Sequence, residues 1–313
     1  MTAEPPPMSG RNGSDGATSR HFRVLVNPLT GGGSAPAAVA RVERLLTRAG
    51  AQVRVEPSTS AEQSRASAAE AIARGEVVVA AGGDGMLASI AGTVVEHGGT
   101  LGIVPSGRGN DFARMLRIDG DPEKLAHHLL EGDPTPVDVI ETRPAGGGPA
   151  TVVLGSMYAG VDSLASEIVD RARRLPSAVQ YPYAAVRALL TYRPACFTVT
   201  VDGQRLEQDA YAVVVANSGY YGKGMHIAPA ADVHDGHLDV VVLPAGSRLG
   251  MVRRLPKVYD GSHADLPEVT VLRGRSVEVA SATDVPAYGD GERLGPLPRT
   301  ATVLPGALSV LLA

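Results

Sequence analysis

A glycine-rich turn that carries one aspartate is the stretch of this chain best suited to do chemistry. Residues 82–85, Gly-Gly-Asp-Gly, follow the apolar run 77–81 and precede a stretch from Leu87 that can form a helix. Backbone N–H groups in such a turn, together with the helix N-terminus, can bind a phosphate. Because Asp84 would repel a phosphate, the pattern predicts an intervening Mg²⁺ with Asp84 on the metal side. A simple tight turn is the alternative.

Two further glycine-rich turns follow predicted strands in the same region. One comprises residues 27–34 after the strand 22–26, and the other comprises residues 106–111 after the strand 101–105. Strands and helices alternate here, which predicts a parallel sheet with helices on its faces. Because the carboxyl ends of such strands share one edge, we expect the turns to converge on one ligand. Asp111 could join a metal site, or it could cap the helix that follows.

Other candidate acids lie farther along the chain. Asp138 is part of the strand predicted over 135–141, where a strand-end carboxylate is the simpler interpretation. Asp290 and Glu292 flank a glycine in a segment that could also be an ordinary turn. An aspartate can accept the proton of a hydroxyl during phosphoryl transfer, so Asp290 is a candidate general base. The glycine turns match neither a P-loop nor a dinucleotide-binding fingerprint.

Length and composition limit the class of protein. A chain of 313 residues with 44% hydrophobic residues is long enough for two domains. The net charge of −4 and the pI of about 6.1 argue against a nucleic-acid partner. Cys196 is the only cysteine, so no intrachain disulfide can form. No apolar run is long enough to span a bilayer. These features predict a cytoplasmic protein without a transmembrane segment.

The sequence predicts two folded domains after a disordered tail. Residues 1–20 are rich in Pro, Gly, Ser and Asn and cannot bury enough surface to offset the entropy of ordering. Residues 21–143 are expected to form the α/β domain, and residues 144–313 a mostly antiparallel β domain. We expect only one strong helical stretch in the second domain, from about Tyr181 to Thr191.

Five motifs occur in an order that resembles one known family. They are Asn27-Pro28 with its glycines and the segments 82–85, 105–114, 235–239 and 290–292. Their order is similar to that in the bacterial diacylglycerol kinase/lipid kinase family, which includes sphingosine and ceramide kinases and is distantly similar to NAD kinases. The resemblance implies an N-terminal α/β nucleotide-binding domain with a parallel, Rossmann-like sheet. It also implies a C-terminal β-sandwich domain that binds the acceptor, ATP in the cleft between them, and a last strand that can pack back on the first domain.

The resemblance assigns catalytic and nucleotide-binding roles by position. Asp290 would be the general base, with Glu292 as its neighbour in the site. The residues implied to bind the nucleotide are Asn27, Gly31, Gly83, Asp84, Gly85, Gly107, Arg108 and Asn110.

The resemblance also implies two Mg²⁺ sites. A water-bridged Mg²⁺ network beside the nucleotide would be formed by Asp84, Asp111 and Asp138. A second, structural Mg²⁺ would be held by Asp235, helped by backbone carbonyls near Asp232 and His237.

Two positions depart from the family pattern. Met86 and Arg108 stand where the family usually has threonine. The loss of two hydroxyls removes two candidate partners of a phosphate or a metal-bound water. Arg108 could replace one of them with a bidentate phosphate contact. The departures therefore put the choice of phosphoryl donor and the rate in question.

The motifs together predict an ATP- and Mg²⁺-dependent kinase that phosphorylates the hydroxyl of a diacylglycerol- or sphingoid-like lipid at the membrane surface. Peripheral association with the membrane and a homodimer are both compatible with this prediction. The alternative enzyme is a kinase for a soluble polyol or a nucleotide such as NAD. The alternative from another class is a non-catalytic nucleotide-binding sensor, which Met86 and Arg108 would favour. The identity of the acceptor does not follow from the sequence.

Overall fold

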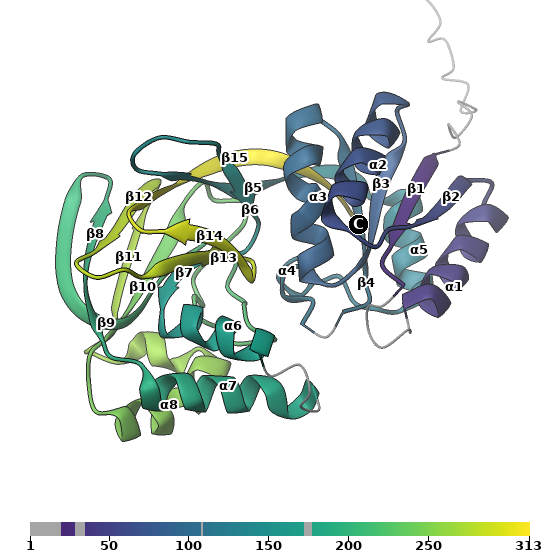
Figure 1. Cartoon of the computed structure of the whole chain (residues 1–313). Coiled ribbons are helices and arrows are strands. Elements are labelled where there is room, and N and C mark those ends of the chain that lie inside the picture. The colour runs from purple at the N-terminus through teal and green to yellow at the C-terminus, as the bar shows by residue number, and fades with distance from the viewer. Residues whose placement is uncertain (1–19, 29–34, 108, 172–176) are drawn as a thin grey trace, which may run out of the picture.

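The computed structural model describes residues 20–28, 35–107, 109–171 and 177–313. The predicted disordered tail, apart from Arg20, lies outside the described residues, and so do Gly31 and Arg108. The chain forms two lobes that lie side by side (Figure 1). Parallel strands build the first lobe and mostly antiparallel strands the second, which confirms the predicted fold class.

Strands and helices alternate in the first lobe. Its sheet has the strand order β4-β3-β1-β2, and neighbouring strands run parallel. The elements are β1 (His21–Val26), α1 (Ala35–Arg48), β2 (Gln52–Pro57), α2 (Ala61–Ala73), β3 (Val77–Gly82), α3 (Asp84–His97), β4 (Thr100–Pro105), α4 (Asp111–Met115), α5 (Pro122–Glu131) and β5 (Asp133–Pro144).

Helix α3 connects the core of this lobe to the glycine-aspartate turn. Strand β3 is a run of small and β-branched residues that is buried, as is usual for a strand covered on both faces. Ile90 and Val94 of α3 are fully buried in the core of the lobe, which fixes the helix in place. The helix begins directly after Gly83, earlier than the predicted start at Leu87, so Asp84 is its first residue.

The second lobe contains most of the remaining strands, a group of helices and one short 3-10 helix, η2. Its elements are β6 (Thr151–Val153), β7 (Ser156–Gly160), α6 (Val161–Arg171), α7 (Ser177–Thr191), β8 (Ala195–Val201), β9 (Gln204–Ala216), β10 (Leu238–Pro244), α8 (Arg248–Asp260), η2 (Ser262–Asp265), β11 (Thr270–Gly274), β12 (Ser276–Ser281), β13 (Pro286–Gly289), β14 (Glu292–Pro296) and β15 (Arg299–Leu312).

The prediction of one strong helical stretch in the second domain is wrong, because α6 and α8 form beside α7. Helix α6 starts directly after β7, so no turn residue separates its helical pattern from the strand pattern. Helix α8 contains Pro256, a residue that usually ends or kinks a helix, and has no fully buried residue. The three helices lie together on one side of the lobe (Figure 1). No helix in the described part of the chain is long and apolar enough to cross a membrane.

The last strand connects the two lobes. β15 pairs antiparallel with β12 and β5, and its residues Ser309 and Val310 pair in parallel with Thr100 and Leu101 of β4. It therefore runs from the second lobe into the sheet of the first, as the yellow ribbon in Figure 1 shows. Because β15 is hydrogen-bonded to strands of both lobes, it fixes the position of one lobe relative to the other.

Candidate active site

One continuous cavity of about 800 Å³ opens between the lobes and extends into the second lobe. The first lobe contributes Asn27 and the glycine turns after β3 and β4, as the sequence predicts. The second lobe contributes the hairpin that carries Asp290 and Glu292. Segments that are far apart in the sequence therefore meet at one site, and most of the predicted nucleotide-binding and catalytic residues lie on its wall.

Two of the predicted glycines are required by close packing of the turns. A Cβ atom at Gly107 would lie 2.4 Å from the Cα of Gly83, which is far closer than real contacts allow. The two turns thus pack backbone against backbone, and the N-terminus of α3 stands beside them. Gly85 differs, because a Cβ atom there would meet no protein atom within 4 Å, although Gly85 lines the cavity. The space beside Gly85 is therefore open to a ligand.

Asn110 shapes the second turn and does not line the cavity. It adopts a left-handed conformation with φ of 52°, which asparagine tolerates better than most residues. Its side chain accepts a hydrogen bond from the Gly107 N–H at 2.9 Å and donates one to the Gly107 carbonyl at 3.1 Å. The geometry therefore gives Asn110 a role in shaping the turn, and its predicted direct contact with the nucleotide stays a prediction.

Asp84 and Asp111 come together at the edge of the first lobe. The Phe112 N–H donates to Asp84 Oδ1 at 3.3 Å, and a Cβ atom at Gly109 would lie 2.8 Å from Asp84 Oδ2. Both oxygens of Asp111 accept backbone hydrogen bonds from the second lobe, from Lys223 at 2.8 Å and Gly224 at 2.7 Å. Burial, together with the charge of Asp84, raises the pKa of Asp111. Asp111 therefore joins the lobes, and it does not cap helix α4.

Asp290 occupies the turn between β13 and β14, with φ of 49°. Its carboxylate accepts backbone hydrogen bonds from Leu154 at 2.6 Å, Gly155 at 2.8 Å and Ser156 at 3.3 Å. Burial outweighs these bonds and raises the pKa of Asp290 to about 6, with a further contribution from the charge of Asp84. A carboxylate that is held rigidly and has a raised pKa is well suited to accept a proton near neutral pH.

The acids of the cleft can contribute to a magnesium site without forming one alone. No group of three or more His, Cys, Asp or Glu side chains among the described residues could hold a metal ion. The charge of Asp84 raises the pKa of both Asp111 and Asp290, so a cation beside Asp84 would relieve mutual repulsion. Mg²⁺ keeps several waters and needs only one or two protein oxygens, so Asp84 with the phosphates of a nucleotide fits its requirements.

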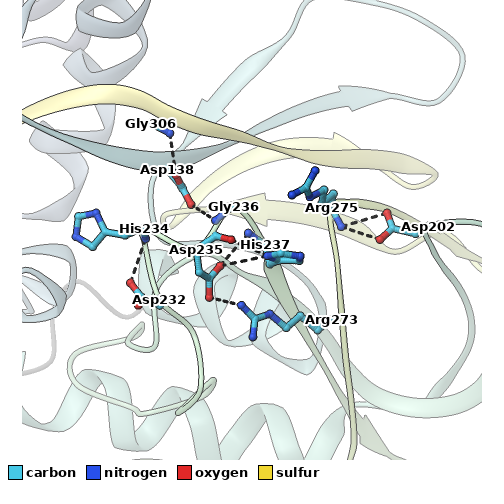
Figure 2. A network of polar contacts seen from close by, with 10 residues as sticks. All are labelled: Asp138, Asp202, Asp232, His234, Asp235, Gly236, His237, Arg273, Arg275 and Gly306. Atoms are coloured by element: carbon cyan, nitrogen blue, oxygen red, sulfur yellow. Dashed lines mark hydrogen bonds and ion pairs between the residues drawn. The ribbon is translucent and has the colours of Figure 1, made fainter.

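Asp138 does not share this site. It is 2% exposed and does not line the cavity. One oxygen accepts a hydrogen bond from the Gly236 N–H at 2.7 Å, and the other accepts one from the Gly306 N–H at 2.7 Å. Figure 2 shows the carboxylate between these two backbone segments. Both oxygens link β5 to a turn and to the bulge of β15, which indicates a structural role; the place of Asp138 in a water-bridged Mg²⁺ network stays a prediction.

The carboxylate of the predicted structural Mg²⁺ site already has a cationic partner. One oxygen of Asp235 accepts a hydrogen bond from the His237 N–H at 2.9 Å, and the other is paired with the guanidinium of Arg273 (Figure 2). Asp232 uses its carboxylate to accept a hydrogen bond from the His234 N–H at 3.0 Å. A cation at this carboxylate would compete with Arg273. We therefore expect the arginine to supply the positive charge that the resemblance assigns to a metal.

This substitution of arginine for a metal predicts how the protein responds to chelation. In nucleotide-free protein, we expect the unfolding temperature to be the same in EDTA as in Mg²⁺. Arg273→Ala is expected to lower the free energy of unfolding by at most about 1 kcal/mol, because the ion pair is partly exposed, and to lower the unfolding temperature slightly. In that variant Mg²⁺ should restore part of the loss. The neighbouring variant Arg275→Ala is the control, and a wild-type protein that loses stability in EDTA would contradict the assignment.

Sequence reasoning missed several groups that build the site. The N–H groups of 154–156 that hold Asp290 belong to an apolar segment without a motif. Tyr220 stacks on His226 with ring centroids 4.4 Å apart, and the guanidinium of Arg114 lies 5.6 Å from the Tyr220 centroid. This stack crosses from the first lobe to the second at the rim of the cavity. Its only signal in the sequence is an aromatic pair inside the glycine-rich loop 217–224.

Glycine turns, a cluster of acids and a buried aspartate facing one interlobe cavity define a two-lobed kinase. The family model of the diacylglycerol kinase catalytic domain matches residues 21–142. The model of the YegS C-terminal NAD kinase beta sandwich-like domain matches residues 155–312. The chain belongs to the bacterial diacylglycerol kinase/lipid kinase family, which confirms the resemblance found in the order of its motifs.

Individual relatives support this membership. A diacylglycerol kinase of Mycobacterium tuberculosis (strain ATCC 25618 / H37Rv) is 31% identical over 310 residues, which cover 95% of this chain and 98% of that protein. A diacylglycerol kinase of Bacillus subtilis (strain 168) is 24% identical and covers 89% of this chain and 92% of its own length. The crystal structure of a diacylglycerol kinase from Bacillus anthracis str. Sterne has the same fold, with a TM-score of 0.74 at 19% identity over 95% of this chain and 98% of that one.

Proposed function

We propose that this protein transfers the γ-phosphoryl group of ATP to the hydroxyl of a lipid. The observation that carries the proposal is the shape of the cavity, which has the glycine turns and acids at one end and an apolar interior at the other. The interior is enclosed by α6, α7, α8 and strand β10 and is lined by Val169, Leu189, Leu243, Leu255, Val258 and Val269. The diacylglycerol kinase names of the relatives agree with a lipid acceptor.

Each end of the cavity has a defined task in this proposal. The backbone N–H groups after β3 and the N-terminus of α3 bind the phosphates, and Asp84 faces the same space. Asp290, between this end and the apolar interior, accepts the proton of the acceptor hydroxyl as that oxygen attacks the γ-phosphorus. Mg²⁺, when bound beside Asp84 through water, would neutralise charge on the phosphates. Glu292 is exposed at the rim and adds negative charge next to Asp290.

A transfer assay with radiolabelled ATP separates the proposal from its alternatives. Purified protein is offered a lipid extract or a mixture of soluble polyols and nucleotides that includes NAD. We expect label in the organic phase only. Label confined to the aqueous products would favour the soluble-acceptor kinase, and ATP binding without any transfer would favour the nucleotide-binding sensor.

Gly85 tests whether the nucleotide approaches the turn after β3. Because a Cβ atom at this position meets no protein atom, Gly85→Ala should fold with an unchanged unfolding temperature. The added methyl group projects into the space assigned to the phosphates, so the KM for ATP should rise at least about tenfold.

The matched control is Gly92→Ala in the same helix, where a Cβ atom would make only ordinary contacts of 3.7 Å or more with Val152. That variant should leave the KM for ATP unchanged. An unchanged KM in Gly85→Ala would contradict the placement of the phosphates.

A further inference from the structure

A buried carboxyl in the apolar part of the cavity has no role in the steps described above. Asp162 lies in the first turn of α6 and lines the cavity. Its Oδ2 atom is buried and has no hydrogen-bond partner among the described residues. The Tyr221 hydroxyl donates a hydrogen bond to the same carboxyl group, and burial raises the pKa of Asp162 to about 6. The protein therefore satisfies only one oxygen of this carboxyl group.

A second buried polar atom without a partner stands near Asp162. Among the described residues, the hydroxyl of Tyr192 is also buried and also has no hydrogen-bond partner. Burial, with a contribution from the charge of Asp162, raises the pKa of Tyr192 to about 12, so its hydroxyl keeps its proton. Tyr192 does not line the cavity, so Asp162 is the unpartnered group that a ligand in the cavity can reach. Buried polar groups left unpaired are costly, and natural proteins retain few of them.

A chain of aromatic contacts relates Asp162 to the strand that carries the candidate base. Tyr221, which is bonded to Asp162, makes an edge contact with Tyr158 at a centroid distance of 5.7 Å. Tyr158 in turn stacks on Tyr288 at 6.0 Å, and Tyr288 lies two residues before Asp290 on β13. Asp162 and Asp290 line the same cavity, so Asp162 can meet the remainder of an acceptor whose reacting hydroxyl faces Asp290.

We propose that Asp162 binds a second hydroxyl on the head group of the acceptor lipid. The inference rests on the proposed lipid kinase function and adds the class of substrate to it. A hydroxyl can donate a hydrogen bond to Asp162 Oδ2. The ester carbonyls of a diacylglycerol can only accept, and they would face a carboxylate. The structure thus favours a long-chain acceptor with two hydroxyl groups, of the monoacylglycerol type, over one with a single hydroxyl.

The test compares phosphorylation of a monoacylglycerol with that of a diacylglycerol of the same acyl chain, in the same detergent micelles. The expected result is a kcat/KM at least about tenfold higher for the monoacylglycerol, since a buried site built for a hydroxyl discriminates strongly against its absence. Asp162→Asn should bring the ratio of the two kcat/KM values close to one. Glu167→Gln, on the same helix but ion-paired with Arg171 and outside the cavity lining, should keep the wild-type ratio.

The outcomes separate this inference from the proposed function. Equal use of both lipids by the wild-type protein would overturn the role of Asp162 and leave the lipid kinase intact. A decrease of kcat/KM in Asp162→Asn by the same factor for both lipids would also overturn this role, because a purely structural carboxyl affects every acceptor alike. Failure to phosphorylate either lipid, with transfer to a soluble acceptor, would contradict the proposed function itself.

Discussion

Asp290→Asn is expected to lower kcat by about 10²–10⁴-fold while the affinity for ATP stays close to that of the wild-type protein. The amide keeps the size of the side chain and one oxygen that can accept from the N–H groups of 154–156, but its NH₂ group faces another of these donors, so a loss of stability is expected as well. It cannot take the proton of an acceptor hydroxyl at neutral pH. Transfer of radiolabel from ATP measures kcat, and fluorescence titration with a nucleotide analogue measures affinity.

Asp202→Asn provides a matched control for this variant. Asp202 also precedes a glycine in a hairpin, has a φ of 47°, and accepts backbone hydrogen bonds from Arg275 and Ser276. It does not line the cavity. Any loss of activity caused by weakening an aspartate-glycine hairpin should appear in both variants, so a large loss in Asp290→Asn alone is expected. Wild-type turnover by Asp290→Asn would show that another group accepts the proton.

The raised pKa of Asp290 also sets the pH dependence of the reaction. A general base must be ionised, so kcat/KM should be constant above the pKa and fall about tenfold for each pH unit below it. Burial places this acid limb near pH 6, and a cation beside Asp84 would move it lower. The limb is therefore expected at or below about pH 6 and should be absent in Asp290→Asn. A limb that persists in the variant would belong to a different residue.

Asp138→Asn is expected to reduce stability with little change in the rate of phosphoryl transfer. Both carboxylate oxygens accept buried N–H groups, and the amide of asparagine would present a donor to one of them. The expected loss is on the order of 2–3 kcal/mol, which corresponds to several degrees in the unfolding temperature. Calorimetry measures the loss, and kcat measured well below that temperature should stay within about twofold of wild type.

Asp84→Asn should behave in the opposite way. Asp84 is partly exposed at the cavity, so its replacement should leave the unfolding temperature nearly unchanged and abolish most of the Mg²⁺-dependent activity. The two variants together test whether Asp84 acts in metal binding and Asp138 in stability, although the resemblance places both in one metal network. A selective loss of Mg²⁺-dependent activity in Asp138→Asn would return this residue to the metal site.

The sequence is sufficient to predict the parallel lobe and its glycine turns, because short buried strands and glycine-rich connections are local patterns. The same is true of Asp84 and Gly107, which lie within those turns. The partners of the acids could not be predicted, since they are set by contacts over long distances in the chain. Asp290 is bonded to N–H groups up to 136 residues away.

The helices of the second lobe were difficult to predict because of the residues at and around their ends. Helix α6 follows β7 without an intervening turn, and α8 is interrupted by Pro256 and contains no fully buried residue. The pairing of Asp235 with Arg273 was equally hidden, because it depends on the antiparallel register of β10 and β11 that sets Asp239 opposite Arg273. Register of this kind is fixed by the folded sheet and has no local signal.

A crystal structure with a non-hydrolysable ATP analogue, Mg²⁺ and a long-chain acceptor tests the central claim most directly. The account predicts the triphosphate beside Gly83–Gly85, the acceptor hydroxyl within about 2.6–3.2 Å of the Asp290 carboxylate, and the chain enclosed by α6, α7 and α8. An acceptor bound outside this cavity, or a hydroxyl beyond hydrogen-bonding reach of Asp290 with the triphosphate in place, would contradict it.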